Sequence, residues 1–279
     1  MVILSFNHKR SLVLSLLLGY FVLMAAYMEL PDGKNHLYFF NIGQGDSVFF
    51  NSKDNYQILI DGGPNSLVLE RLSEVMPFFD KSIDLVVLSH PHKDHLDGLI
   101  AVIDHYQISN IILTGVNHHS DSYDELLRRL NTRVDIKVWF AYAEFDFTLG
   151  GTFLDIIYPD RSLLLMNSDN LNNSSIVLKL ITDEVSILLT GDIELEVETY
   201  LVGKNIDLEA DILKIPHHGS KSSSTYPFLK KVSPLFAVIQ SGINNQFDHP
   251  HNETMRKLES IKGLKILRND VDGMVEFSW

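Results

Sequence analysis

Short apolar runs rich in β-branched residues alternate with amphipathic stretches along residues 36–279. Apolar runs bounded by turn residues predict buried strands, and apolar positions three or four apart predict helices. The predicted strands are 36–42, 47–51, 56–60, 83–89, 110–114, 134–140, 153–158, 175–182, 185–190, 211–216, 234–240 and 272–277. The predicted helices are 66–76, 96–106, 123–131, 194–203, 223–231 and 252–260. Strands flanked by helices in both halves predict an α/β fold, an αββα sandwich of two mixed sheets with outer helices.

The N-terminal region has a different pattern. Residues 12–28 carry no charge, and they follow Lys9 and Arg10 and precede Glu29 and Asp32. A membrane span needs roughly 17–25 apolar residues, and the basic side of a span stays inside. We therefore expect residues 1–35 to form a single-pass membrane anchor, with a domain at 36–279 outside the cytoplasm. A cleaved secretory signal, which would release the domain, is the alternative, although a small-residue cleavage site is poorly formed.

Composition removes several classes of chemistry. The chain has no cysteine, which excludes disulfides, thiolate metal ligands and a cysteine nucleophile. Neither a Ser-x-x-Lys site nor a Gly-x-Ser-x-Gly turn stands at a suitable strand end, so no serine nucleophile is expected. We also expect no dinucleotide cofactor. The formal net charge of −13 counts against tight binding of a polyanion through a broad basic face.

The strongest chemical signal is a histidine and aspartate cluster at the end of the predicted strand 83–89. His90, His92, Asp94 and His95 lie within six positions. Imidazole and carboxylate ligands suit zinc, manganese or iron, and two such ions about 3.5–4 Å apart form a hydrolytic centre. A solvated polar loop would be the plainer interpretation, but the apolar strand directly before the cluster argues against it.

Two further strands end in side chains of the same kind. The strand 185–190 leads into Asp192, and the strand 211–216 leads into His217 and His218. Asp192 could instead cap the helix predicted at 194–203. Adjacent strand residues point to opposite sides, so we do not expect both histidines to bind one ion unless the chain turns there.

Seven motifs in order make the chain resemble the metallo-β-lactamase superfamily and, within it, the C-terminal domain of ComEC-type competence proteins, which take DNA across a membrane. The motifs are Asn41–Ser47, Leu59–Gly63, the cluster at 90–95, Asn172–Leu178, Leu189–Asp192, Ala210–Ser220 and His249–His251. The sequence lacks the polytopic channel of that family, so a role as the DNA-conducting channel is not expected.

The resemblance implies two divalent ions, zinc or manganese, and assigns their ligands. It assigns His90 and His92 to one ion, Asp94 and His95 to the other, and Asp192 to a bridge between them.

The resemblance also implies a further ligand after the strand 211–216. His218 is the preferred residue to complete the second ion, and His217 then contacts a ligand or the substrate. Many members have another histidine where this chain has Asn172–Ser175. Its absence leaves open coordination positions and favours phosphoester over lactam substrates. Asn173 and Ser174 become candidate substrate contacts there.

Other residues are candidates for supporting roles. Asp61 could orient a metal-bound histidine through its second ring nitrogen or could simply shape a turn. Asp46 has the same two possibilities, with the turn favoured. Ser220 and Lys221 precede a predicted helix and could hold a phosphate, although an ordinary capping loop explains the serine equally well.

His249 and His251 lie in the loop before the helix predicted at 252–260. Histidine near neutral pH can donate a hydrogen bond to a phosphate or protonate a leaving group. We expect a catalytic role for His249, beside Asp94 and Asp192, and leave open whether His251 serves function or stands beside the helix cap.

These patterns lead to one expectation and its alternatives. We expect a metal-dependent phosphodiesterase, a nuclease of the ComEC type that acts outside the cytoplasmic membrane on a phosphodiester such as DNA. Hydrolysis of a small or wall-linked phosphodiester, as by phosphorylcholine esterases, is the alternative that the acidic charge favours. A non-catalytic accessory domain of a DNA-uptake machine is an alternative from a different functional class. Measurements of metal content and turnover would distinguish such a domain from an enzyme.

Overall fold

Two sheets form the centre of the molecule. The computed structural model describes residues 6–28, 32–143 and 145–279. The first sheet has seven strands, in the order β14 (Val275–Ser278), β1 (His36–Phe39), β2 (Val48–Asn51), β3 (Gln57–Ile60), β4 (Ser82–Val87), β5 (Gln107–Leu113) and β6 (Lys137–Phe140). The second also has seven, in the order β13 (Lys265–Arg268), β12 (Phe236–Ile239), β11 (Ile212–Lys214), β10 (Ser186–Leu189), β9 (Val177–Ile181), β8 (Thr152–Tyr158) and β7 (Phe147–Leu149).

Both sheets are mixed, with one antiparallel and one parallel half. In the first sheet β14, β1, β2 and β3 pair antiparallel, whereas β3 to β6 run parallel. In the second sheet β7 to β10 pair antiparallel, whereas β10 to β13 run parallel. The parallel strands are connected through helices, as parallel pairing requires. Their carboxyl ends are the positions from which the candidate site is built.

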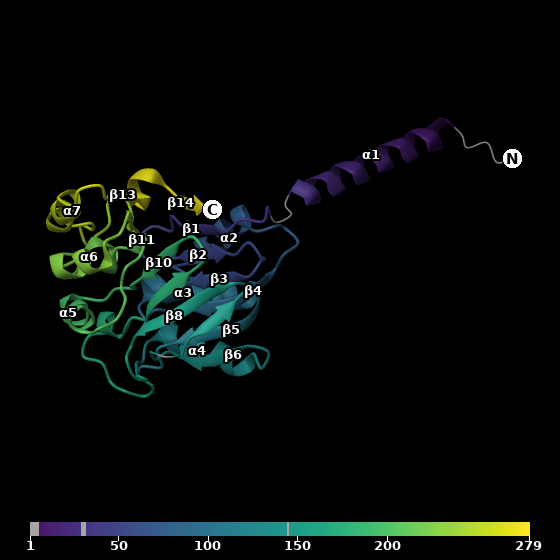
Figure 1. The fold of residues 1–279 in the computed structure, drawn as a ribbon. Coiled ribbons are helices and arrows are strands. Elements are labelled where there is room, and N and C mark those ends of the chain that lie inside the picture. Colours follow the sequence, from purple (N-terminus) through teal and green to yellow (C-terminus); the bar gives the residue numbers. More distant parts are fainter. Residues whose placement is uncertain (1–5, 29–31, 144) are drawn as a thin grey trace.

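Helices cover the outer face of each sheet (Figure 1). Side chains of α2 (Leu67–Val75), α3 (Lys93–His105) and α4 (Asp121–Thr132) pack on the first sheet in one apolar cluster. Side chains of α5 (Leu195–Gly203), α6 (Tyr226–Val232) and α7 (Asn252–Glu259) pack on the second sheet in another. A third apolar cluster fills the space between the sheets. The predicted αββα sandwich of two mixed sheets is confirmed.

Several element boundaries differ from the predictions. Helix α3 begins at Lys93 instead of residue 96, so Asp94 and His95 lie in its first turn. Strand β14 begins at Val275, because the short helix α8 (Asn269–Asp272) precedes it. The outermost strands β7 and β13 of the second sheet were not predicted. They are three and four residues long and largely half-exposed, so neither carries a buried apolar run.

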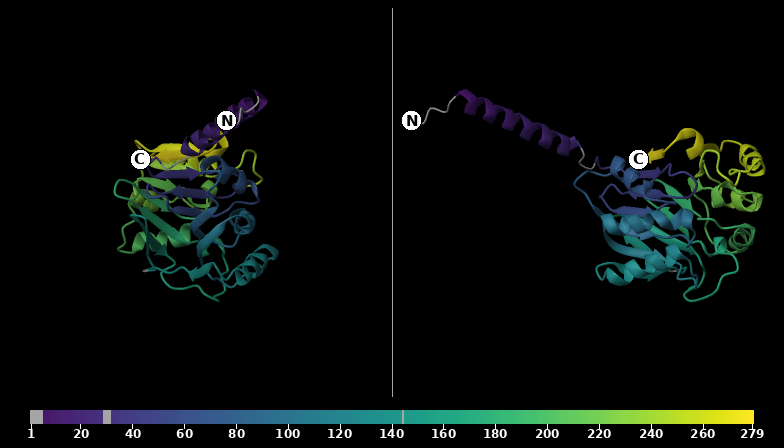
Figure 2. Two further views of the ribbon diagram at one scale, coloured as in Figure 1. Left: turned by 90° about the vertical axis from the view of Figure 1, so that its right-hand side faces the viewer. Right: turned by 180° about the vertical axis from the view of Figure 1, so that it is seen from behind.

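The N-terminal helix α1 (Phe6–Met28) projects away from the sandwich (Figure 2). Among residues 6–28, 32–143 and 145–279, the structure has no helix long and apolar enough to cross a membrane. The prediction of a membrane-spanning anchor is therefore not supported. The parts of the predicted anchor or signal at 1–5 and 29–31 lie outside the described residues.

Candidate metal centre

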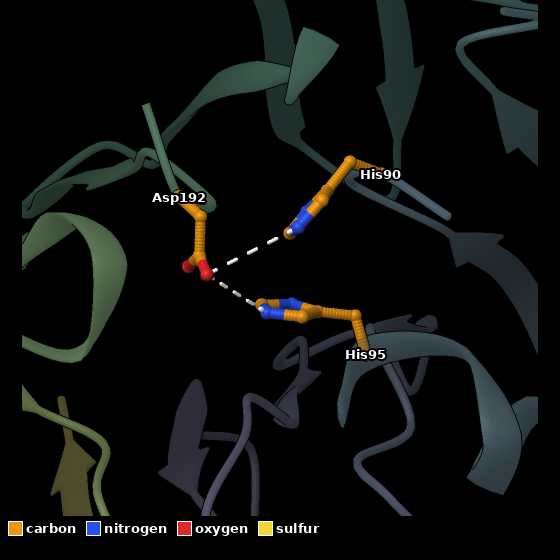
Figure 3. Close-up of side chains that lie close together, drawn as sticks. All are labelled: His90, His95 and Asp192. Atoms are coloured by element: carbon orange, nitrogen blue, oxygen red, sulfur yellow. Dashed lines mark ion pairs between the residues drawn. The ribbon is translucent and has the colours of Figure 1, made fainter. Parts of the chain in front are cut away.

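The candidate site lies where parallel strands of both sheets end. The loop after β4 carries His90 and His92, and the first turn of α3 carries Asp94 and His95. Asp192 follows β10 across the sandwich. Figure 3 shows His90 and His95 pointing toward Asp192 from the opposite side. The fold thus brings together residues that are about a hundred positions apart in the chain.

One carboxylate oxygen of Asp192 is the point on which the cluster converges. Asp192 Oδ2 lies 4.0 Å from His90 Nε2 and 3.3 Å from His95 Nε2. It also lies 3.2 Å from Nε2 of His218. His90, His95 and His218 are buried, and Asp192 is buried as well. The structure therefore places the residue that the resemblance gives as the bridge among the imidazoles that the resemblance assigns to two different ions.

Of the remaining predicted ligands, Asp94 and His218 form a group with His95, whereas His92 belongs to none of the groups that could hold one ion among the described residues. His218 Nε2 lies 3.3 Å from Asp94 Oδ2, and both residues face the same space as His95. His92 is partly buried, and its Nδ1 lies 2.9 Å from His90 Nε2. Four groups of three histidine and acidic side chains in the described residues have ligand atoms close enough to hold one ion, and they overlap at His95, Asp192, His218 and Asp46.

The donor set fits divalent metal ions. His95 Nε2, His218 Nε2 and Asp192 Oδ1 are buried and make no hydrogen bond. Asp46 Oδ1 is also buried and makes no hydrogen bond. Buried polar atoms without a partner are rare in native proteins, and each calls for an explanation such as an ion. Nitrogen and carboxylate ligands at one point are those that zinc and manganese bind.

Asp61 orients the cluster from behind. It follows β3 with a φ of 59°. Its Oδ1 accepts the backbone N–H of Ser89 at 2.7 Å, and its Oδ2 accepts the Ser89 hydroxyl at 2.7 Å. The same Oδ2 lies 2.8 Å from His95 Nδ1. A carboxylate on Nδ1 leaves Nε2 of His95 free to face the cluster. Of the two roles expected for Asp61, this geometry supports the orienting one.

The two ring nitrogens of His218 are divided in the same way. His218 Nδ1 lies 2.9 Å from the carbonyl oxygen of Gln240, so this nitrogen donates and Nε2 faces Asp94 and Asp192. In the ion-free protein, burial opposes the charged form of His218. The carboxylates of Asp192 and Asp46 outweigh burial and raise its pKa well above the ordinary value.

Sequence reasoning missed one charged pair in the site. Lys214 is fully buried on β11 and forms an ion pair with Asp46. Its Nζ also donates to the carbonyl oxygen of Gly191 at 3.1 Å and lies 3.5 Å from Asp192 Oδ1. A lysine inside an apolar strand was the available signal, because a buried ammonium requires a partner. Asp46 was expected mainly to shape a turn, whereas its side chain reaches the cluster.

Two close backbone approaches hold the first turn of α3 in place. A Cβ atom on Gly45 would lie 2.1 Å from the carbonyl oxygen of Asp94. A Cβ atom on Gly98 would lie 1.8 Å from the carbonyl oxygen of Gly62. The N–H of Gly62 donates to the His95 carbonyl at 2.7 Å across this contact. Glycine at these positions therefore sets where Asp94 and His95 stand.

A cavity of about 290 Å³ opens beside the cluster, and its lining includes His92, Asp94, Asp192, His217, His218 and His249. His217 and His218 have φ values of 50° and 53°, in the left-handed region, and lie in the turn Pro216–Gly219 after β11 has ended. The turn sends the two rings in different directions: His218 to the cluster, and His217 toward Glu194, with 3.1 Å between Nδ1 and Oε1.

His249 faces the cavity without joining the cluster. It is 9% exposed, and its Nδ1 makes no hydrogen bond. Burial and the neighbouring His218, His217 and His251 lower the pKa of His249 to about 4. The imidazole is therefore neutral near pH 7, which favours a hydrogen-bonding role over proton donation by an imidazolium.

Other predicted contacts point elsewhere. Asn173 Oδ1 accepts the N–H of Glu194 at 2.8 Å, and the Ser174 hydroxyl donates to the carbonyl of Leu171 at 2.7 Å. Neither lines the cavity, whereas Asn172 does. Ser220 contacts Ser222, and the backbone N–H of Lys221 donates to His251 Nδ1 at 3.1 Å. Ser220, Lys221 and His251 do not line the cavity either.

The fold and this cluster define a metallo-hydrolase class. The chain belongs to the metallo-beta-lactamase superfamily, whose family model matches residues 41–242. It is 27% identical over 256 residues to ComE operon protein 3 of Bacillus subtilis, a match that covers 86% of this chain and 32% of that protein. It is 28% identical over 253 residues to competence protein ComA of Neisseria gonorrhoeae, covering 89% of this chain and 33% of that protein. The predicted resemblance is confirmed, and the chain spans about a third of these relatives' length.

Solved structures show the same fold at low sequence identity. YhfI of Bacillus subtilis, a metallo-beta-lactamase fold protein, is 14% identical with a TM-score of 0.60, covering 88% of this chain and 99% of that one. Igni18, a metallo hydrolase of Ignicoccus hospitalis, is 17% identical with a TM-score of 0.57, covering 87% and 98%. At this identity the likeness establishes the fold alone.

Proposed function

We propose that this protein is a dinuclear metal-dependent phosphodiesterase that cleaves nucleic acid. The observation that carries the proposal is the convergence of three buried imidazoles on Asp192 Oδ2, with the facing ring nitrogens of His95 and His218 left without a hydrogen bond. Such a cluster is costly to bury unless cations bind to it.

The proposal divides the ligands into two groups that share Asp192. His90 and His92 would hold one ion, and Asp94, His95 and His218 the other, with Asp192 shared. When bound, two divalent ions supply an activated water and stabilise the leaving oxygen of a phosphoester. Asp61 and the Gln240 carbonyl fix the ring orientations of His95 and His218, so these ligands do not reorganise during turnover.

His249 acts on the substrate side. The residue lines the cavity, its buried Nδ1 has no hydrogen bond, and its lowered pKa keeps the ring neutral near pH 7. A neutral imidazole offers one N–H, which would donate to a phosphate oxygen in the cavity. Loss of His249 should therefore reduce turnover more than metal content.

The relatives favour a polynucleotide substrate. One relative that covers most of this chain is named as a competence protein and another as a ComE operon protein, so we infer a role in DNA uptake, outside the cytoplasm. The region 172–175 lacks the further histidine of many superfamily members, which leaves coordination positions open and favours a phosphoester over a lactam, whether the phosphoester is a polynucleotide or a small diester.

A small phosphodiester is the second candidate. The net charge of −13 repels a polyanion at long range and would matter less for a substrate with one negative charge.

Hydrolysis by the full chain tests the proposal. The protein is stripped with a chelator, reloaded with Mn²⁺ or Zn²⁺, and offered single-stranded DNA, duplex DNA, RNA and p-nitrophenyl phosphorylcholine. We expect metal-dependent cleavage of a polynucleotide that Asp192→Asn abolishes. Turnover of the small diester alone would assign the second candidate, and no turnover with either metal would point to a non-catalytic accessory role.

A further inference from the structure

An exposed phenylalanine stands at the mouth of the polar cavity. Phe247 lines the same cavity as Asp94, Asp192 and His249, yet 48% of its surface remains exposed. Its ring centre lies 5.8 Å from that of His249, with 27° between the ring planes. Phe247 thus contacts an imidazole of the site while much of its ring faces solvent. An apolar ring beside a charged cluster adds nothing to the core, so it requires another explanation.

The loop that carries Phe247 is held in one shape. Asn245 Oδ1 accepts the backbone N–H groups of Phe247 at 3.1 Å and of His249 at 3.0 Å. Its Nδ2 donates to the carbonyl oxygens of Gly242 at 2.9 Å and of His249 at 2.5 Å. A ring presented by a pre-organised loop binds a flat partner with little loss of conformational entropy.

The chemistry around the ring suits a nucleotide. Lys93 is exposed and lines the same cavity. Its ammonium group can therefore bind a phosphate while Phe247 contacts the base. In the described part of the chain, Phe247 is the one Phe, Tyr or Trp among the lining residues. Sites for quaternary ammonium groups surround the cation with several rings, whereas base stacking requires only one open aromatic face.

We infer that Phe247 is a stacking platform for a nucleobase adjacent to the cleaved phosphate, which makes single-stranded polynucleotide the preferred substrate. The inference rests on the proposed phosphodiesterase function. Bases inside a duplex are already stacked on one another, so an exposed ring selects bases that are free to leave the stack.

The test compares substrates with and without bases. Wild type, Phe247→Ala and Phe247→Trp are assayed on oligothymidylate, on an oligomer of equal length built from abasic residues, and on p-nitrophenyl phosphorylcholine. Ile243→Ala is the matched control, because Ile243 is 70% exposed and does not line the cavity. Equilibrium binding of the labelled oligomers to the ion-free protein, measured by fluorescence anisotropy, provides a readout that needs no turnover.

We expect Phe247→Ala to weaken binding and kcat/KM for oligothymidylate by about 5- to 150-fold. The abasic oligomer should change less than about twofold, and Phe247→Trp should keep the wild-type preference. Equal loss on both oligomers, or no loss, overturns the inference, and so does a loss confined to phosphorylcholine. Failure of the proposed phosphodiesterase function would give a different result, because the wild-type protein would then cleave no substrate with either metal. In that case the anisotropy measurements by themselves test whether Phe247 stacks on a base.

Discussion

At the scale of single residues, two buried aspartates receive different roles from their surroundings. Asp61 accepts two hydrogen bonds from Ser89 and contacts His95 Nδ1, so its oxygens are occupied. Asp192 keeps Oδ1 without a hydrogen bond and presents Oδ2 to imidazole nitrogens. The first carboxylate is suited to orient a ligand, and the second to be one.

Asp61→Asn should weaken metal binding by about 10- to 100-fold, because an amide nitrogen would face the Ser89 hydroxyl or His95 Nδ1 and disturb the ring orientation. Titration calorimetry with Mn²⁺ measures the affinity. Asp183→Asn is the control, since the Asp183 side chain is 81% exposed and pairs with the exposed Lys53. Wild-type affinity in Asp61→Asn would show that Asp61 merely shapes a turn.

His249 should make the ion-free protein sensitive to acid. Its pKa is lowered from 6.5 to about 4, chiefly by burial and then by His218, His217 and His251, with Asp192 opposing them. Between these values the unfolded chain binds more protons at this residue than the folded chain. The stabilisation is therefore full above pH 6.5 and is lost as the pH falls toward 4.

Urea unfolding between pH 7.5 and 5 checks this expectation. His249→Gln should lose less stability on acidification than wild type, whereas His119→Gln, at an exposed position, should follow wild type. Parallel pH profiles for wild type and His249→Gln would contradict the burial of a neutral imidazole at this position.

At the scale of elements, the start of α3 is the part of the scaffold that the site depends on most. The helix meets the loop after β3 backbone to backbone, with the Gly62 N–H donating to His95 at 2.7 Å and the Gly98 N–H donating to Gly63 at 2.9 Å. Only a residue without a side chain fits at Gly98. The contact links Asp61 to the ligands on α3.

Gly98→Ala should destabilise the fold by about 1–3 kcal/mol, since the added methyl group forces backbone atoms apart. Elsewhere in a helix the same change stabilises by up to about 1 kcal/mol. Gly203→Ala on α5 is the matched control, because a Cβ atom there meets nothing within 4 Å. Equal free energies of unfolding for the two variants in urea would contradict the close packing of α3.

Much of the site was predictable because its residues follow apolar strands. The cluster at 90–95, Asp192 and His218 each come directly after a buried strand, and parallel strands end at one edge. Lys214 and Phe247 were not found in this way. The lysine inside an apolar strand was a signal for Lys214, but its partner Asp46 lies in a distant segment. The position of Phe247 depends on contacts between distant segments, and no local pattern in the sequence indicates it.

At the scale of the whole molecule, the net negative charge repels the kind of substrate that the site is proposed to bind. The chain carries 36 acidic against 23 basic residues, while the proposed substrate is a polyanion. Long-range repulsion slows the encounter, and it is screened over about 8 Å at physiological salt against about 30 Å at 0.01 M. The attraction between the substrate phosphates and the cavity must therefore act at short range.

Raising the ionic strength from about 0.01 to 0.15 M should lower KM for oligothymidylate, because salt screens the repulsion. KM for p-nitrophenyl phosphorylcholine should change little over the same range. Steady-state kinetics at constant free Mn²⁺ make the comparison. A steep rise of KM for the oligomer with salt would instead reveal a basic track along the surface, as counterion release requires.

The central claim is that one cluster holds two divalent ions through Asp192. Equilibrium dialysis of the full chain against Mn²⁺, followed by elemental analysis, measures it most directly. We predict two ions per wild-type chain and fewer in Asp192→Asn, with circular dichroism unchanged between them. A wild-type chain that retains no ion, or an Asp192→Asn chain that retains as many as wild type, would contradict the account.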